Sequence, residues 1–267
     1  MKRKTEEMAM SNTHLIDAHA HIFFHRNPDE EKQRLLKIID SYGIDEMYVS
    51  GLNGAFPSVD TVDEINEYVA RFSIECPNVK GYVYVSPEHE NALSVLERGI
   101  EDFNMIGAKI WISEYCDDHK VDALAEKLIE YKRPLLIHAF KKVGGQIAKE
   151  STAQNVRNLA LRYPELKILM AHVGGNCYHG VPFVRDLKNV WVDVSGTSSR
   201  TNEVEYTVEN LGEDRVIFGS DVTGTSFAVP YGKVLGASIS DVAREKLLYS
   251  NAKKLFDCRL GAKEALQ

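Results

Sequence analysis

Several patterns that mark particular classes of protein are missing from this sequence. The four cysteines, Cys76, Cys116, Cys177 and Cys258, are far apart and form no CxxC pair. We therefore expect reduced thiols in a cytoplasmic protein. No apolar run approaches the roughly 20 residues needed to span a bilayer. The chain starts with charged residues, but no apolar segment of the signal-peptide kind follows them, so residues 1–13 are expected to form a flexible tail.

Basic residues are also in the minority. The chain has 32 lysines and arginines against 39 aspartates and glutamates, which gives a formal net charge of -7. Proteins that bind a phosphate backbone show a basic stripe, so this balance argues against a nucleic-acid partner, and the missing apolar span argues against a membrane. The expected partner is a small-molecule substrate, and a homo-oligomer is compatible with the sequence.

Short apolar runs and amphipathic segments alternate along the chain of 267 residues. The apolar runs are rich in β-branched residues, as in strands buried on both faces of a parallel sheet. The predicted strands cover residues 15–22, 46–50, 81–86, 107–112, 134–138, 167–172, 190–195 and 216–221. The predicted helices cover residues 29–41, 62–75, 91–103, 121–131, 152–162, 182–187, 204–210 and 241–256.

This alternation predicts an α/β fold, a (β/α)8 TIM barrel in a single domain over residues 14–267. The rival architecture is an open, doubly wound sheet. It is weakened because no glycine-rich phosphate fingerprint follows the first predicted strand.

Residues that carry chemistry stand at the ends of the predicted strands. His19 and His21 are two residues apart in the first strand, so the alternation of side chains aims both imidazoles the same way. Later strands supply Lys109, His138, His172 and Asp221. In a barrel the carboxyl ends of the strands form the active-site bowl, so these side chains should face one cavity. Imidazole and carboxylate donors together suit Zn2+, with Mn2+ or Fe2+ as alternatives.

Six segments in a fixed order carry a resemblance to a known family. They are residues 16–21 (IDAHAH), 133–138 (RPLLIH), 163–175 (YPELKILMAHVGG), 189–196 (NVWVDVSG), 215–221 (RVIFGSD) and 251–256 (NAKKLF). As a set they resemble the amidohydrolase superfamily, and specifically its amidohydrolase-related (amidohydrolase 2) branch, over about residues 14–256. The resemblance implies a metal-dependent (β/α)8 enzyme.

The resemblance also implies roles for the strand-end residues. One divalent metal, most often zinc, would be held by His19, His21, His138 and Asp221. His172 would stand beside it as a base or polarising group, or would bind a second metal. Lys109 lies where some relatives carry a carboxylated lysine that bridges two metals; alternatively it packs in the barrel or contacts a substrate carboxylate.

The default reaction is hydrolysis of an amide, lactone or ester by a metal-activated water. Asp221 and His172 are the expected catalytic residues, with Asp221 accepting a proton from the water and later delivering it to the leaving group. Asp17 is expected to support the site through hydrogen bonds rather than to bind the metal. Alternatively, it is a strand-start residue whose carboxylate is satisfied by backbone N–H groups.

Three other functions stay open. Non-oxidative decarboxylases of aromatic or muconate-type acids share the metal ligands, although no strand-end arginine for a substrate carboxylate is obvious here. A TatD-like metal-dependent deoxyribonuclease has a similar first strand, but the acidic balance and the Phe-Gly-Ser-Asp ending of the last strand count against it. A barrel that only binds a ligand or partner would have no need for four convergent histidines and an aspartate.

Substrate contacts should come from the loops that follow the strands. The candidates are Asn53, Phe56, Trp111, Glu114, Tyr115, Phe140, Lys141, Asn176, Tyr178, Ser198, Arg200 and Thr223. Lys141 and Arg200 would suit an anionic substrate.

Overall fold

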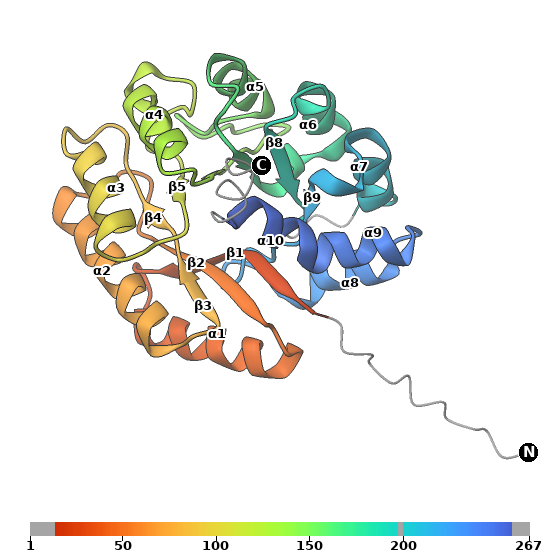
Figure 1. Cartoon of the computed structure of the whole chain (residues 1–267), viewed down its shortest axis with the longest axis horizontal. Helices are drawn as coiled ribbons and strands as arrows, with labels where there is room; N and C mark the ends of the chain where they lie inside the picture. Colours follow the sequence, from red (N-terminus) through yellow and green to blue (C-terminus); the bar gives the residue numbers. More distant parts are fainter. Residues whose placement is uncertain (1–13, 197–199, 258–267) are drawn as a thin grey trace, which may run out of the picture.

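A computed structural model of the protein describes residues 14–196 and 200–257, and the expected tail, Ser198 and Cys258 lie outside this part. Strands and helices alternate along it (Figure 1). The strands are β1 (Ile16–Phe23), β2 (Glu46–Leu52), β3 (Val79–Gly81), β4 (Val83–Tyr84), β5 (Ala108–Ile110), β6 (Leu135–Ile137), β7 (Ile168–Met170), β8 (Val190–Asp193) and β9 (Val216–Ile217). The α-helices are α1 (Pro28–Tyr42), α2 (Val59–Glu75), α3 (Ala92–Glu101), α4 (Asp122–Glu130), α5 (Ala153–Arg162), α6 (Cys177–Val184), α7 (Glu203–Leu211), α8 (Ala228–Gly236), α9 (Asp241–Glu245) and α10 (Asn251–Phe256). Tighter or wider helical turns are η1 (His119–Val121), η2 (Ala171–Gly175), η3 (Glu213–Arg215) and η4 (Lys246–Ser250).

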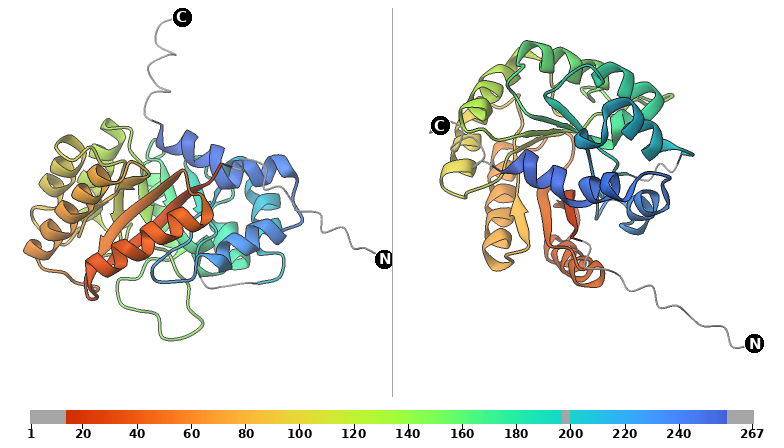
Figure 2. Two further views of the ribbon diagram at one scale, coloured as in Figure 1. Left: turned by 90° about the horizontal axis from the view of Figure 1, so that it is seen from below. Right: turned by 45° about the vertical axis from the view of Figure 1, so that its right-hand side comes forward.

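The strands are parallel neighbours in the orders β1-β2-β3 and β4-β5-β6-β7-β8-β9. Backbone hydrogen bonds cross both gaps between these two groups. Tyr82, between β3 and β4, donates its N–H to Val49 O of β2 at 2.8 Å. Ala18 of β1 donates to Phe218 O, directly after β9, at 3.1 Å. The helices lie outside the strands (Figures 1 and 2), and the architecture is the (β/α)8 TIM barrel that the sequence predicts.

Local signals set the bounds of the first helix. The Asn27 side-chain oxygen accepts from the backbone N–H of Asp29 at 3.0 Å and so satisfies a free donor at the start of α1. Gly43 ends the helix at a φ of 63°, a left-handed conformation that glycine adopts at little cost. Leu35 and Ile39 are buried on the face that packs against the barrel.

Apolar side chains fill the inside of the barrel and close one of its ends. Tyr82 and Leu136 belong to a buried cluster that joins strands far apart in the ring, and the Tyr82 hydroxyl donates to Ala18 O at 2.8 Å. Phe256 of α10 packs against the rings of Tyr48 and Tyr82, with centroid distances of 4.7 and 5.7 Å. This plug covers the amino end of the strands, so a site for chemistry lies at their carboxyl end.

The last third of the chain departs from the predicted helix pattern. Helix α6 begins five residues before the predicted start at 182, because the Asn176 side chain caps it by accepting from Tyr178 N–H at 3.0 Å. Helix α8 was not predicted, since Pro230 and glycines interrupt its pattern. The single helix predicted over 241–256 is instead α9, the π-helical turn η4 and α10.

The two ends of the barrel differ in what surrounds them. The loop between β6 and α5 projects from one end, and α10 lies at the other (left view of Figure 2).

Among residues 14–196 and 200–257, no helix combines the length and apolar character needed to cross a membrane. The cysteines in the same part, Cys76, Cys116 and Cys177, are free thiols.

Candidate metal centre

Two histidines of β1 converge at the carboxyl end of the barrel. His19 and His21 are 0% and 2% exposed, and their Nε2 atoms lie 2.9 Å apart. The Nδ1 atom of each ring contacts a residue on another strand. His19 Nδ1 lies 2.8 Å from Asp193 Oδ2, and His21 Nδ1 lies 2.8 Å from Ser50 Oγ on β2. A carboxylate only accepts, so His19 carries its proton on Nδ1 and presents the Nε2 lone pair to the inside.

Asp221 adds an oxygen to these two nitrogens. Its Oδ1 lies 3.4 Å from His21 Nε2 and 3.8 Å from His19 Nε2. Its backbone has a φ of 64° and its N–H donates to His19 O at 2.7 Å, which fixes the carboxylate over β1. Burial raises the pKa of Asp221 to about 7, while Lys109 lowers it.

Gly219 and Asp17 allow the segment that carries Asp221 to lie this close to β1. A Cβ on Gly219 would lie 2.7 Å from the Cβ of His19, so only glycine lets the segment after β9 lie this close to β1. Asp17 accepts from the backbone N–H of Ser220 at 2.9 Å and of His19 at 3.1 Å, which is the supporting role expected of it. Burial raises the pKa of Asp17 to about 7 against these hydrogen bonds.

The donor atoms fit a divalent cation. His19, His21 and Asp221 each offer one ligand atom within 4.8 Å of the others. Two imidazole nitrogens and a carboxylate oxygen suit zinc, manganese or iron. The outer partners Asp193 and Ser50 orient both rings as the surroundings of metal sites do.

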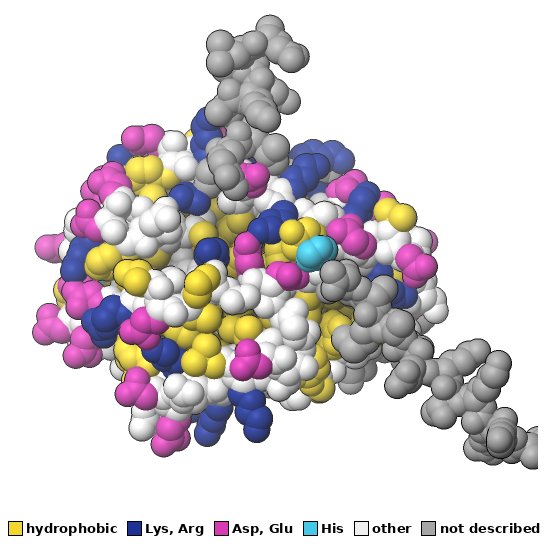
Figure 3. All heavy atoms as spheres, turned by 60° about the horizontal axis from the view of Figure 1, so that its bottom comes forward, with side chains coloured by type: hydrophobic (Ala, Val, Ile, Leu, Met, Phe, Trp, Pro, Cys, Tyr) yellow, Lys and Arg dark blue, Asp and Glu magenta, His cyan; other side chains and the backbone are white. Residues whose placement is uncertain are grey.

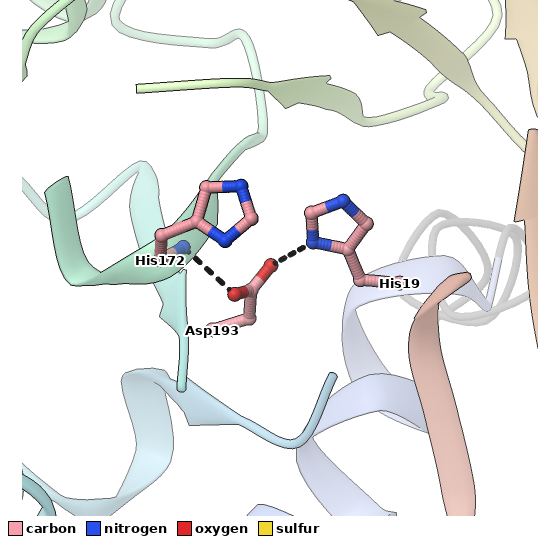
Figure 4. A group of neighbouring side chains, drawn as sticks. All are labelled: His19, His172 and Asp193. Carbon is pink, nitrogen blue, oxygen red and sulfur yellow. Dashed lines mark hydrogen bonds and ion pairs between the residues drawn. The ribbon is translucent and has the colours of Figure 1, made fainter. Parts of the chain in front are cut away.

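A second group of donors shares His19 (Figure 4). Asp193, at the end of β8, accepts from His19 on one oxygen and from the backbone N–H of His172 on the other, at 2.9 Å. Ser195 Oγ lies 2.8 Å from His172 Nδ1 and also contacts Asp193. His172 itself has a left-handed φ of 59° in η2, which turns its ring toward His19 at a centroid distance of 5.1 Å.

His138 is linked to this group of donors through the ring of His172. Its Nδ1 lies 3.2 Å from His172 Nε2, and its Nε2 lies 3.1 Å from Glu150 Oε1. It is not among the donors grouped with His19, His21 and Asp221. Its membership of the metal's ligand set therefore stays a prediction.

Lys109 is fully buried on β5, and its Nζ lies 3.4 Å from His19 Nε2. Burial lowers its pKa to about 8, against the charges of Asp221 and Asp193. Burial is also the largest cause that lowers the pKa of His19, His21 and His172 well below the usual histidine value. These imidazoles are neutral at physiological pH, the form that binds metal.

The predicted substrate-binding residues differ in the contacts that they make. Glu114 is 2% exposed and is held by Lys149 Nζ at 2.6 Å and Lys120 Nζ at 3.0 Å. Tyr178 donates its hydroxyl to Thr201 O at 3.0 Å. The side chain of Asn176 caps α6.

The other candidates differ in exposure and contacts. Arg200 donates to Gly175 O at 3.1 Å, Tyr115 and Phe56 are exposed at 38% and 58%, and Lys141 is exposed. Asn53, Trp111 and Phe140 are half-buried. Thr223 contacts Glu31. Their roles in binding a substrate stay predictions.

Four residues of the site were not singled out from the sequence. Asp193 and Ser195 carry the same strand-end signal as the histidines, because they close the apolar run at 190–195. Ser50 ends the predicted second strand in the same way. Glu150 lies in a loop with no periodic pattern, so no sequence signal marks it.

The family model for amidohydrolases, named Amidohydrolase, matches residues 16–258. The chain belongs to the amidohydrolase family. No curated protein matches this amidohydrolase significantly.

Solved structures share its fold at low identity. A 2,6-dihydroxybenzoate decarboxylase from Rhizobium superposes with a TM-score of 0.75 at 17% identity, covering 91% of this chain and 98% of the other. A dihydroxybenzoic acid decarboxylase from Polaromonas sp. JS666, solved with manganese and 2-nitroresorcinol, gives 0.74 at 19%, covering 95% and 99%. A 4-oxalomesaconate hydratase from Rhodopseudomonas palustris gives 0.68 at 18%, covering 94% and 99%. At these identities the likeness shows a shared fold.

Proposed function

We propose that this amidohydrolase-family protein is a metal-dependent, non-oxidative decarboxylase of a small aromatic or unsaturated carboxylic acid. The observation that carries the proposal is the buried ammonium of Lys109 beside the donors His19, His21 and Asp221. It supplies an anion-binding group next to a cation site. The decarboxylases among the structures of the same fold support the same chemistry.

His19, His21 and Asp221 would hold the cation, with His172 and His138 beside them. A bound divalent cation supplies Lewis-acid stabilisation of the charge that develops on the substrate when CO2 leaves. The manganese named for the Polaromonas enzyme makes Mn2+ the first ion to test and Zn2+ the second.

Lys109 would bind the substrate carboxylate. His19 Nε2 has one lone pair, so a bound cation and the Lys109 N–H compete for it. An ammonium that loses this acceptor in a fully buried position needs another acceptor in contact with it. A substrate carboxylate would provide that acceptor, and carboxylation of Lys109 itself is the other way to remove the buried ammonium.

Asp221 would move the proton. Its side chain is 20% exposed, more than either histidine beside it, so it faces the bowl. In the reaction Asp221 delivers a proton to the carbon that carries the carboxylate, the carbon–carbon bond breaks, and its electron pair stays on that carbon as CO2 departs. Water then returns a proton to Asp221.

Hydrolysis of an amide, lactone or ester is the second candidate. The observation that favours it is the same Asp221 carboxylate next to the cation donors, since a carboxylate there can also take a proton from an attacking water. The deoxyribonuclease hypothesis gains no support from the family match, and on the face drawn in Figure 3 basic and acidic side chains are interspersed rather than gathered in a stripe.

The test is a reaction in ¹⁸O-labelled water. Protein loaded with Mn2+ or Zn2+ is incubated with 2,6-dihydroxybenzoate, 5-carboxyvanillate, and a panel of neutral lactones, esters and amides. We expect CO2 release from an acid and no ¹⁸O in the organic product. Consumption of a lactone, ester or amide with ¹⁸O uptake, and no CO2 from any acid, would overturn the decarboxylase proposal and establish the hydrolase.

A further inference from the structure

His138 has a different partner on each ring nitrogen. One partner, the Glu150 carboxylate, can only accept a hydrogen bond, whereas the other, His172, can accept or donate. Glu150 Oε1 lies 3.1 Å from Nε2, and His172 Nε2 lies 3.2 Å from Nδ1. An ionised carboxylate is only an acceptor, so Nε2 carries the proton. The Nδ1 lone pair of His138 then faces the interior, toward His172 and the candidate metal centre.

Glu150 is built to stay ionised while it is buried. It is 3% exposed, and its second oxygen accepts from Lys142 Nζ at 3.0 Å, Gln146 Nε2 at 2.7 Å and Ile147 N–H at 3.3 Å. Burial alone would raise the pKa of Glu150, but the hydrogen bonds from His138 and Lys142 lower it below its usual value.

All the partners of Glu150 other than His138 belong to one loop, residues 140–150 between β6 and α5. The middle of this loop is exposed, with Val143 fully exposed and Ile147 at 41%. The carboxylate is therefore assembled by the fold of the loop itself, and it joins that loop to the strand-end histidine.

Lys149, the residue before Glu150, holds the same end of the loop to a second strand. Lys149 has a left-handed φ of 64°, which lets its side chain and that of Glu150 point to different elements. Lys149 Nζ lies 2.6 Å from Glu114, in the segment after β5. The loop end is thus tied to the strand ends of both β5 and β6.

We propose that Glu150 is a positioning residue for the metal centre, which fixes the ring of His138 in the Nε2–H form so that Nδ1 faces the cation. The inference rests on the proposed metal centre, but not on the substrate. Carboxylates that hold the outer nitrogen of a metal-binding histidine typically change metal affinity by 10–100-fold when they are removed.

The test measures Mn2+ affinity by titration calorimetry on the full chain, without substrate. E150L removes both charge and acceptor at similar size, and we expect about tenfold or greater loss of affinity. E150Q keeps an acceptor oxygen and should recover part of it. E46Q is the matched control, because Glu46 is also ion-paired, with Lys253, but lies at the amino end of β2; it should bind Mn2+ like the unmodified protein.

A second readout follows the imidazole directly. In ¹⁵N-histidine-labelled protein without metal, the chemical shifts of the His138 ring should report the Nε2–H form, and E150L should shift the ring toward the Nδ1–H form. Unchanged Mn2+ affinity together with an unchanged His138 ring in E150L would overturn the proposal. Failure of decarboxylation with any acid would leave both measurements intact, so the two proposals are tested separately.

Discussion

Asp193 holds two histidines of the candidate centre with one carboxylate. It accepts from His19 Nδ1 at 2.8 Å and from the His172 backbone at 2.9 Å, and it is fully buried. Replacing one of its oxygens with an amide removes the charge and one of these acceptors. The ring of His19 and the backbone of His172 are therefore both held by this one side chain.

We expect D193N to weaken Mn2+ binding by about 10–100-fold, because the outer partner of His19 sets which ring nitrogen faces the cation. Titration calorimetry measures the change. D186N is the control, since Asp186 pairs with Arg157 on the surface. Equal Mn2+ affinity for D193N and the unmodified protein would show that Asp193 does not orient the site.

Lys109 gives a prediction that separates two roles. If it binds the substrate carboxylate, K109M should weaken binding of 2,6-dihydroxybenzoate by about tenfold or more, the range of a lost charge-assisted hydrogen bond. Affinity for Mn2+ should stay equal or rise, because a cation beside His19 Nε2 is removed. Calorimetry with each ligand measures both, with K80M on β3 as the control.

A loss of Mn2+ affinity in K109M, accompanied by the added mass of one CO2 on the unmodified protein, would instead identify Lys109 as a carboxylated ligand. The two outcomes differ in the sign of the change in metal affinity.

At the scale of elements, the segment after β9 must lie against β1 for Asp221 to meet the two histidines. The contact of Gly219 with His19 sets this approach. A methyl group at position 219 would force the two segments apart, and inserting atoms into a packed interior typically costs about 1–3 kcal/mol.

We therefore expect G219A to lower the free energy of unfolding by about 1–3 kcal/mol and to weaken Mn2+ binding. G232A is the matched control, because Gly232 lies in α8, a methyl group there would meet no atom within 4 Å, and alanine favours helix. Urea unfolding and calorimetry measure both effects. If G219A matches G232A in stability, the approach of the two segments tolerates a side chain.

Periodicity in the sequence predicted the elements that repeat. The barrel, and the convergence of His19 with His21, follow from apolar runs and an i, i+2 spacing. Helix α8 could not be predicted, because Pro230 and its glycines remove the pattern although packing against the barrel still forms the helix. Local propensity is a weak guide where tertiary contacts decide.

The site was predictable only where strand ends carry it. Asp193 had that signal, but a carboxylate at a strand end has no unique partner until the neighbouring strands are placed. Glu150 is twelve positions after His138 in a loop, and only the path of that loop brings the two together. His138 itself lies beside His172 rather than against His19 and His21, a difference of packing that no spacing reveals.

At the scale of the whole molecule, the buried histidines and carboxyls of the centre set how stability depends on pH. Burial lowers the pKa of His19, His21, His138 and His172, so below pH 6.5 these rings bind protons more readily in the unfolded chain than in the fold. Burial raises the pKa of Asp17 and Asp221 to about 7, so these two bind protons in the fold but not in the unfolded chain between about pH 4 and 7.

The four imidazoles outnumber the two carboxyls, so the unfolded chain binds more protons than the fold between about pH 5 and 6.5, and stability falls on acidification in this range. We expect the thermal midpoint of the chelator-treated protein to drop steadily from about pH 6.5 to pH 5. Replacing His172 by asparagine should make the slope shallower. A midpoint that rises on acidification would mean that the carboxyls outweigh the imidazoles.

The position of α10 has a practical consequence. Phe256 seals the amino end of the strands, while the loop of Glu150 projects from the opposite end (Figure 2). A surface or fusion partner attached beyond Asp257 would therefore meet the protein on its sealed side. An immobilised form of the protein, tethered in this way, would keep the candidate metal centre at the carboxyl ends of the strands turned toward the solution.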